Sequence, residues 1–522
     1  MMKLKLIISF WFQKIRNGVV ALRTKKALYN TGIGITFTLI SAICSLFVPR
    51  LILLYFGSAY NGLTASISQF LAVITLLSGG ASSVTKAALY KPLAENSLEE
   101  IAGILRATEL FVRKVALIFL GVILIFAIGY SQLVSTQFPW FFSFTLICIL
   151  GLGIFGNYYF GVTFKMLLQA DQKQYIISII LIITTLLNTI VASLLIISGF
   201  SIHMVKLAST LVFLLNPLFV NIYIRRKYKI SLNVAPNYIA LKQRWAAFAH
   251  QVAGFVYKNT DLLLLTYFVD LKEVSVFTVY TMVIRNIRNI ILKFSAGFSA
   301  SFGDMFAKNE LKIAEQNLSI FELIIFSVTT VLLTTTSLLI LSFITIYTQG
   351  IYDVNYDRPL FAFLMVLSAF FNCIRVPYQT LVEAKGHFKQ TRNGAIFESF
   401  LNFILSLILI PYLGIIGAVI GSLCATIFRT FQFLIYLSKN IIRKSLLLFL
   451  KRIMSAVGIA ISTALISLFL FRASPTNLFS WVFQGFVIVL LSSAIAVAVN
   501  YVLYRDDVKR FWKKITLAFG KS

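Results

Sequence analysis

Acidic residues are scarce in this sequence, which has 18 Asp and Glu against 47 Lys and Arg in 522 residues. Charged residues of both signs make up only 12% of the chain, whereas 59% of the residues are hydrophobic and the mean hydropathy is +0.88. A water-soluble domain of this size cannot carry so much apolar surface. The composition therefore excludes a soluble protein and indicates that lipid is the solvent for most of the surface.

Cysteine and histidine are also few, and their seven positions are scattered along the chain. The cysteines form no CxxC pair, and the histidines are too far apart in sequence to suggest a zinc site. We therefore expect neither a structural disulfide nor a bound metal. The residues are Cys44, Cys148, Cys373, Cys424, His203, His250 and His387.

Motifs of the common catalytic sites are missing as well. The chain has no Walker motif, no HExxH, no dinucleotide fingerprint and no recognisable catalytic triad. ATP-driven pumping by this chain is therefore not expected, and neither is an enzymatic activity. We predict no catalytic residue and no cofactor.

Long apolar stretches dominate what is present. Most are about 20 residues or more, enough for a helix to cross about 30 Å of hydrocarbon. The sequence thus predicts an all-α polytopic membrane protein with about 14 transmembrane helices. The expected spans are 29–54, 62–88, 113–135, 138–165, 174–198, 202–224, 246–268, 274–303, 318–348, 359–383, 393–412, 414–437, 453–472 and 479–504.

Basic residues alternate between the two sides of these spans. Four connections carry no Lys or Arg and three carry one, and these seven alternate with six connections that hold most of the basic loop residues. The positive-inside rule places the six connections and both termini in the cytoplasm. Because the net charge of +29 is spread over short loops, we expect membrane lipid as a partner and no nucleic acid.

An internal repeat is visible when residues 167–196 are laid on residues 381–410 at a constant offset of 214. The match pairs Asn188 with Asn402, which chance agreement among apolar residues does not explain. Spans 1 to 6 and 7 to 12 then form two related halves, with spans 13 and 14 added. Halves repeated in the same orientation are typical of transporters, with the substrate path at their interface.

The repeat and the loop charges predict six segments. They are an amphipathic cytoplasmic segment at 1–28, an N-lobe at 29–224, a basic cytoplasmic linker at 225–245, a C-lobe at 246–437, spans 13 and 14 at 438–504, and a basic cytoplasmic tail at 505–522. In addition, 97–114 has acidic residues early and basic residues late, which predicts a cytoplasmic surface helix.

Several basic residues fall inside the expected spans, where an ionisable group by default faces a cavity or a partner. Arg285 and Arg288 are three residues apart and share one helix face. Lys258 lies at the middle of its span and is three residues from Asp261, so a purely structural ion pair is an equal alternative there. The predicted cavity cations are Arg50, Lys206, Lys258, Arg285, Arg288, Arg375 and Arg429. They indicate a cationic path for an anionic substrate, and Asp261 and Glu398 are the two acids we expect to bind a coupling proton or ion.

Three stretches carry a resemblance to a known family. They are PRLILLYFGSAYNGLTASISQFLAVITLLSGGASSVTKAALYKPLAE from residue 49, KNTDLLLL from residue 258, and EAKGHFKQTRNGAIFESFLNFILSLILIPYLGIIGAVIGSLCATIFR from residue 383. They resemble bacterial polysaccharide flippases of the Wzx type, in the multidrug/oligosaccharidyl-lipid/polysaccharide exporter superfamily. The likeness extends over most of spans 1 to 12, and its patterns are loose.

The resemblance implies two MATE-like six-helix lobes around a central cavity, with two extra helices, in the bacterial cytoplasmic membrane. It also implies flipping of undecaprenyl-pyrophosphate-linked oligosaccharide repeat units for surface polysaccharide, by alternating access. A glycan polymerase and other assembly proteins are then expected partners. A MATE-type small-molecule exporter and a lipid II flippase are the alternatives, whereas a glycosyltransferase would need a larger outward loop.

Overall fold

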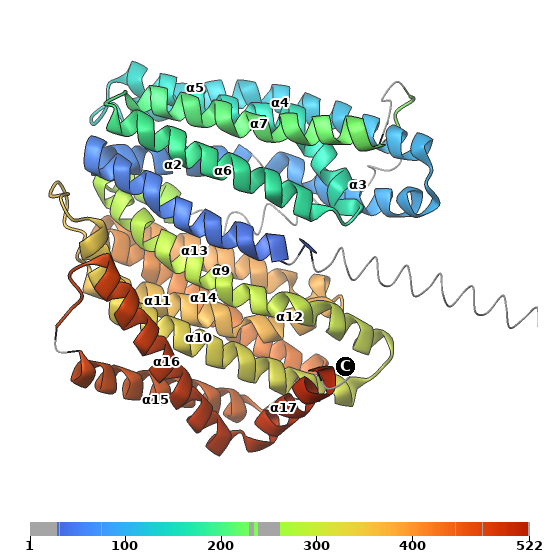
Figure 1. Ribbon diagram of the computed structural model, residues 1–522, viewed down its shortest axis with the longest axis vertical. Coiled ribbons are helices and arrows are strands. Elements are labelled where there is room, and N and C mark those ends of the chain that lie inside the picture. Colours follow the sequence, from blue (N-terminus) through green and yellow to red (C-terminus); the bar gives the residue numbers. More distant parts are fainter. Residues whose placement is uncertain are drawn as a thin grey trace, which may run out of the picture. The chain divides into compact units, whose positions relative to one another are not determined.

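The computed structural model describes residues 29–30, 32–74, 76–228, 234–238, 261–443, 445–471 and 473–519. Within these ranges the chain folds into helices without any strand (Figure 1). Eleven of the described helices are long and apolar enough to cross a membrane. The predicted all-α, multi-pass membrane fold is confirmed. The segment 1–28 and most of the linker 225–245 lie outside the described residues.

The chain divides into two compact units. Unit 1 holds residues 1–56 and 67–255, and its core at one end gathers residues such as Leu89, Leu105, Leu167 and Ile224. The helix pairs α4 and α5, α5 and α7, and α6 and α7 pack most extensively in it. Its helices are Gly32–Phe56, the later part of α2 (Ser58–Ile74), α3 (Leu76–Glu95), α4 (Leu98–Leu133), α5 (Trp140–Ala170), α6 (Gln174–Ile197) and α7 (Ile202–Tyr228).

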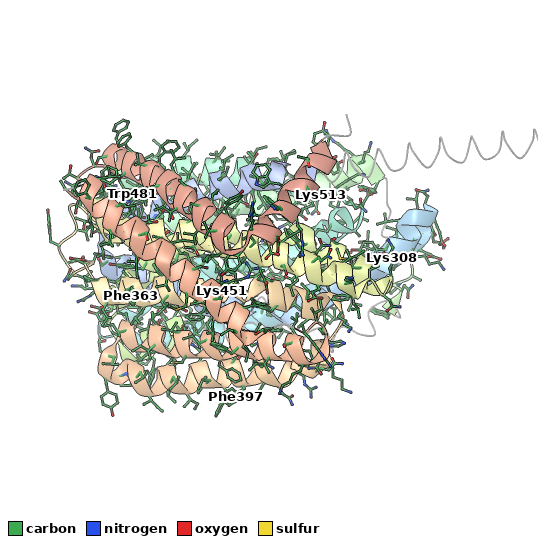
Figure 2. All side chains as sticks on the ribbon, turned by 90° about the horizontal axis from the view of Figure 1, so that it is seen from below. Lys308, Phe363, Phe397, Lys451, Trp481 and Lys513 are labelled. Atoms are coloured by element: carbon green, nitrogen blue, oxygen red, sulfur yellow. The ribbon has the colours of Figure 1, made fainter. Side chains whose placement is uncertain are left out.

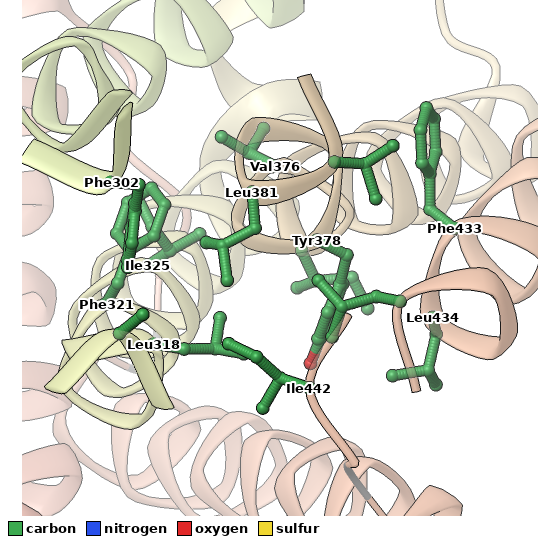
Figure 3. Close-up of a cluster of buried hydrophobic side chains, with 14 of the residues drawn as sticks. Phe302, Leu318, Phe321, Ile325, Val376, Tyr378, Leu381, Phe433, Leu434 and Ile442 are labelled. Atoms are coloured by element: carbon green, nitrogen blue, oxygen red, sulfur yellow. The ribbon is translucent and has the colours of Figure 1, made fainter. Parts of the chain in front are cut away.

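Unit 2 holds residues 57–66 and 256–522. A large buried cluster joins α9, α10, α12 and α14 around Phe302, Phe321, Tyr378 and Leu434 (Figure 3). Besides the start of α2 and the helical residues 261–268, it contains α9 (Leu271–Ala307), α10 (Leu311–Tyr347), α11 (Pro359–Ile374), α12 (Val376–Ala384), α13 (Phe388–Leu413), α14 (Ile415–Asn440), α15 (Leu446–Leu470), α16 (Leu478–Leu503) and α17 (Arg505–Phe519).

The start of α2 packs against α9 without room for a side chain between them. A Cβ atom added at Gly62 would lie 1.8 Å from the backbone carbonyl oxygen of Leu271. Close to this point the amide of Asn61 donates to the hydroxyl of Ser275 over 2.8 Å. Glycine at position 62 therefore lets the two backbones approach, and the buried hydrogen bond fixes their register.

The predicted surface helix at 97–114 is not a separate element. It forms the first turns of α4, which continues without a break to Leu133. The prediction was wrong because Ile101, Ile104 and Leu105 are buried in the core of unit 1, so this stretch packs on protein. At 1.5 Å per residue, the 36 residues of α4 and the 37 of α10 each extend over about 55 Å, well beyond the hydrocarbon layer.

The predicted span at 359–383 consists of two helices that meet at Arg375. Residue 375 ends α11 and precedes α12, and Pro377 stands in the first turn of α12. Because proline has no N–H to donate to the preceding turn, the helix breaks here. The break places the Arg375 side chain at a junction between helices.

The two halves also share a similar side-chain contact. In unit 1, the Lys173 ammonium donates to the hydroxyl of Tyr228 over 3.0 Å. In unit 2, the position 214 residues later is His387, and its Nδ1 lies 2.9 Å from the hydroxyl of Tyr436. Each contact joins the loop before one helix to the end of the next, so corresponding helices are tied in the same way.

Candidate functional site

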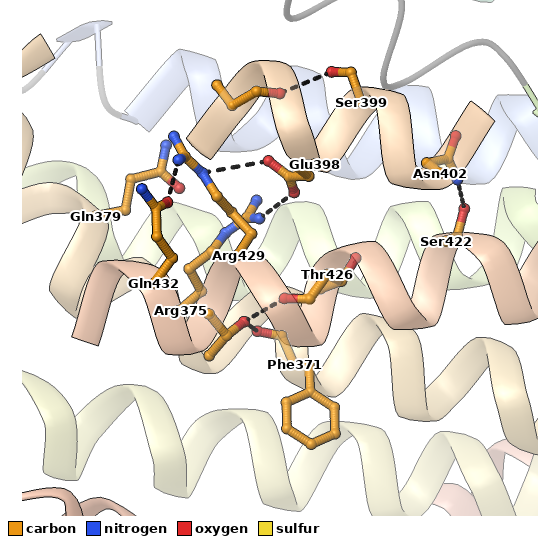
Figure 4. Close-up of polar contacts among 12 residues, drawn as sticks. Phe371, Arg375, Gln379, Glu398, Ser399, Asn402, Ser422, Thr426, Arg429 and Gln432 are labelled. Carbon is orange, nitrogen blue, oxygen red and sulfur yellow. Dashed lines mark hydrogen bonds and ion pairs between the residues drawn. The ribbon is translucent and has the colours of Figure 1, made fainter. Parts of the chain in front are cut away.

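The break at Arg375 carries a buried cluster of two arginines and one glutamate. Arg375 Nη1 donates to Glu398 Oε1 over 2.7 Å, and Arg429 Nε lies 3.4 Å from Glu398 Oε2 (Figure 4). The three side chains come from the α11–α12 junction, α13 and α14, and each is at most 12% exposed. One carboxylate thus faces two guanidinium groups.

Arg429 is held in place by further contacts. Its Nη1 donates to the backbone carbonyl of Thr391 over 3.0 Å and to the side-chain oxygen of Gln432, and its guanidinium lies 4.1 Å from the ring centre of Phe433. The Gln432 amide itself occupies the space where a Cβ atom at residue 394 would lie, since that residue is glycine. The orientation of Arg429 therefore depends on the close approach of α13 and α14.

Arg288 adds a further positive charge next to this cluster. Arg288 of α9 and Arg375 both lie close enough to the buried Cys373 thiol to interact with it electrostatically. The Nε of Arg288 is buried and has no hydrogen-bond partner among the residues that the structure describes. Arg285, one turn earlier on α9, is exposed and repels Arg288. A buried donor without an acceptor is costly, so Arg288 is suited to bind an anion.

A second polar site surrounds Asp261. Asn402 Nδ2 and Ser406 Oγ of α13 each donate to Asp261 Oδ1 over 3.1 Å, and Ser422 Oγ of α14 donates to Asp261 Oδ2. Asn402 and Ser406 are fully buried, and the Oδ1 atom of Asn402 accepts no hydrogen bond from the described part of the chain. The site thus combines a carboxylate with an unused carbonyl oxygen and two hydroxyls, which are oxygen ligands suited to a proton or a small cation.

The structure brings some of the predicted residues together and leaves others apart. Arg375, Arg429 and Glu398 form one cluster. Arg50, on the helix Gly32–Phe56, and Lys206, on α7, are half-buried residues of unit 1. Lys258 lies outside the described residues, so its pairing with Asp261 stays a prediction.

Three residues that hold Asp261 were missed in the sequence. Asn402 was noticed only as the polar match of the repeat, while Ser406 and Ser422 were not noticed at all. Their spacing contains a weak signal, because Asn402 and Ser406 are four residues apart and share a helix face. Among the described residues, no group of three or more His, Cys, Asp and Glu side chains could hold a metal ion.

No protein-family model matches the sequence, and no curated protein matches it. Solved structures are similar. A lipid II flippase MurJ in an inward closed conformation has a TM-score of 0.70 and 16% identity, over 91% of this chain and 100% of that chain. An inward-facing multidrug resistance MATE family transporter of the MOP superfamily has a TM-score of 0.64 and 13% identity, over 79% of this chain and 98% of that chain.

A further similar structure is a MOP superfamily transporter from Pyrococcus furiosus, described as having a binding pocket of reverse polarity. It has a TM-score of 0.53 and 12% identity, over 80% of this chain and 95% of that chain. At such identities the comparisons establish the fold. The chain has the MATE-like fold of two six-helix lobes, with two additional C-terminal helices.

Proposed function

We propose that this chain is a flippase of the bacterial cytoplasmic membrane. It moves undecaprenyl-pyrophosphate-linked oligosaccharide repeat units from the cytoplasmic to the outer leaflet for surface polysaccharide biosynthesis. The observation that carries the proposal is the arginine cluster in the membrane part of unit 2, where Arg375 and Arg429 share one glutamate, Glu398, and Arg288 interacts electrostatically with Cys373, two residues from Arg375. Guanidinium groups bind phosphate oxygens in a bidentate manner, and a pyrophosphate offers several such oxygens.

The geometry suggests how the anion is taken up. A pyrophosphate competes with Glu398 for Arg375 and Arg429, while the unpartnered Nε of Arg288 supplies a donor that is already in place. Glu398 then acts as a resident counter-ion, which keeps the two arginines in position when no cargo is bound. Alternating access of the two lobes exposes this cationic site to each side in turn, and the lipid tail stays in the bilayer.

We assign energy coupling to Asp261. Among the described residues its carboxylate accepts hydrogen bonds from three donors, none of them an arginine, so a proton or a small cation can neutralise it. Helices α13 and α14 supply those donors, and the same two helices carry Glu398 and Arg429. Loading of Asp261 is therefore able to change the arginine cluster through the packing of these helices.

A lipid II flippase is the second function that an observation favours. The MurJ structure matches over the full length of that protein, and lipid II, the cargo in its name, also presents an anionic diphosphate. A MATE-type exporter fits less well, because an arginine-rich site repels the cations that such exporters usually carry. Proteins that polymerise and assemble the glycan are the partners we expect for the proposed function.

The experiment that tests the proposal is deletion of the gene in its native bacterium, followed by analysis of undecaprenyl-linked glycans on each leaflet. We expect a complete oligosaccharide to accumulate on the cytoplasmic side and surface glycan to be lost. Accumulation of lipid II with cell lysis would instead assign the lipid II function. Normal surface glycan together with altered sensitivity to small cationic compounds would overturn both in favour of an exporter.

A further inference from the structure

A buried arginine fastens the C-terminal helices to unit 2. Arg452 of α15 is 6% exposed, its Nε lies 3.4 Å from Glu322 Oε2 of α10, and its Nη2 lies 3.0 Å from Asp507 Oδ2 of α17. Its guanidinium also lies 4.7 Å from the ring centre of Tyr504, which separates α16 from α17. One side chain therefore joins three helices, and α17 is attached through Asp507.

The repeat shows that this arrangement is specific to the second half. Glu109 and Glu322 each stand 11 residues after the first residue of the corresponding long helices, α4 and α10. In unit 1, Glu109 is paired within its own helix, with Arg106 at 3.0 Å and Arg113 at 2.7 Å. In unit 2 the corresponding glutamate, Glu322, is paired with Arg452 of the added helix α15. The added helices thus supply the arginine that α4 supplies from its own sequence in unit 1.

With Asp507 turned inward, α17 presents a different face outward. Asp507, Val508 and Phe511 are half-buried, whereas Lys509, Trp512 and Lys513 are exposed. These three exposed residues are spaced i, i+3 and i+4, so they share one face of the helix. The helix has five basic and two acidic residues in total, and one of the acidic residues is the Asp507 that Arg452 neutralises.

The position of α17 relative to the membrane follows from its neighbours. It begins directly after α16, a largely apolar span of 26 residues, and it contacts α10 and α16. It lies at the end of α15 that carries Lys451 and Arg452, and Figure 2 labels Lys451 on α15 and Lys513 on α17. A basic helix with an exposed tryptophan, starting where a span ends, has the composition of a helix that lies in the headgroup layer.

We propose that the Lys509–Trp512–Lys513 face of α17 binds anionic phospholipid headgroups of the cytoplasmic leaflet. The lysines attract the phosphates, the indole ring lies at the level of the glycerol backbone, and the opposite face is fixed through Asp507, Arg452 and Glu322. The added helices thus connect α10 to the headgroup layer of the membrane. This function is independent of the identity of the cargo.

The test uses the full-length protein in nanodiscs that contain either brominated phosphatidylglycerol or brominated phosphatidylcholine at equal mole fraction. Tryptophan fluorescence is compared between the two lipids, because bromine quenches only rings that it contacts. We expect stronger quenching by the anionic lipid and loss of this difference in Trp512→Phe. The double variant Lys509→Glu with Lys513→Glu should weaken the preference for the anionic lipid about tenfold.

A matched control carries the same charge change elsewhere. Lys389→Glu with Arg392→Glu alters two exposed basic residues at the start of α13 and should keep the difference between the two lipids. Equal quenching by both lipids in the wild-type protein, or a difference that survives in Trp512→Phe, would overturn the proposal. Protection of Trp512 from both lipids would also overturn it, and would show instead that protein covers this face.

Discussion

At the scale of single residues, the cluster of Arg375, Glu398 and Arg429 is a set of interacting buried charges. The two guanidinium groups share one carboxylate, and all three side chains are at most 12% exposed. Removing one partner of a buried ion pair typically costs about 3–5 kcal/mol, because the remaining charge is left without compensation. Glu398 therefore stabilises the empty protein through its contacts with the two arginines.

Glu398→Gln should lower the free energy of unfolding by roughly 3 kcal/mol, since two arginines lose their counter-ion. The measurement is thermal unfolding of the purified protein in detergent, with and without inorganic pyrophosphate. Pyrophosphate should recover stability in the variant more than in the wild-type protein. Glu383→Gln, at an exposed glutamate that accepts a hydrogen bond from Gln379, is the control. An unfolding temperature equal to that of the control would contradict the counter-ion role.

Arg285→Ala with Arg288→Ala should abolish complementation of a deletion strain while leaving the amount of protein in the membrane unchanged. The physical reason is that the exposed Arg285 and the unpartnered Nε of Arg288 contribute little to folding but are available to the cargo. Surface polysaccharide and membrane protein are both quantified. Normal surface polysaccharide in the double variant would remove these residues from the site.

Asp261→Asn should remove the dependence of flipping on an ion gradient, because the neutral amide cannot take up a proton or compensate a cation. Transport in proteoliposomes with imposed proton, sodium and potential gradients is the measurement. Ser422→Ala removes one hydrogen bond to the carboxylate and should shift the coupling without abolishing it. If flipping by Asp261→Asn depends on the gradients as it does in the wild-type protein, Asp261 is not the coupling residue.

The arginine cluster could be anticipated from sequence to a greater extent than the Asp261 site. A charged residue inside an apolar run stands out, which is how Arg375, Arg429 and Glu398 were identified. Hydroxyl residues do not stand out, because most in this fold bond to the carbonyl four residues earlier, as Thr430 does with Thr426. Nothing in the sequence therefore distinguished Ser406 and Ser422 from other hydroxyl residues. Which charged side chains contact one another depends on helix packing, which could not be predicted from the sequence.

At the scale of helices, close backbone approach decides the geometry of unit 2. Gly62 lets α2 pack directly against α9. At the start of α14, a Cβ atom added at Gly417 would lie 2.5 Å from the backbone carbonyl carbon of Leu409. Helix boundaries were the weakest sequence predictions for the same reason. The apolar face of 97–114 was taken for a membrane surface because its partner was unknown, and the break at Arg375 was not anticipated.

Gly62→Ala should lower the free energy of unfolding by about 1–3 kcal/mol, because the new methyl group collides with the Leu271 carbonyl and neither backbone can move freely. Gly121→Ala in α4 is the matched control, since nothing lies within 4 Å of its added Cβ atom. The control should be stabilised by up to about 1 kcal/mol through helix propensity. Equal effects of the two substitutions on thermal unfolding would refute the close contact.

At the scale of the whole molecule, hydropathy and charge predicted the fold class, because lipid imposes a length and a composition on every span. The eleven described helices that can cross a membrane match predicted spans. The span around Arg285 and Arg288 differs in being a helix of 37 residues with several charges in it. These charged residues lower the hydropathy of the span, and they are also the residues on which the proposed function rests.

The predicted orientation of the chain can be tested by single-cysteine labelling in intact cells. In a cysteine-free variant, Ser198→Cys should react with a membrane-impermeant maleimide, because the loop after α6 carries no basic residue and is expected outside. Gln172→Cys, beside Lys173, should react only after the cells are opened. Labelling of both positions, or of neither, in intact cells would contradict the orientation.

The contacts of Lys173 with Tyr228 and of His387 with Tyr436 differ between the two halves. Lys173 and His387 are equivalent in the repeat, whereas Tyr228 and Tyr436 are not, so each half holds this loop with a tyrosine from a different position of the next helix. The nitrogen partner differs as well, because lysine is charged at neutral pH, whereas burial and the nearby Lys385 hold the pKa of His387 below its usual value. Equivalent loops of the two halves thus make the same kind of contact with different charge, so the two connections, both predicted to lie on the cytoplasmic side, are not electrostatically alike.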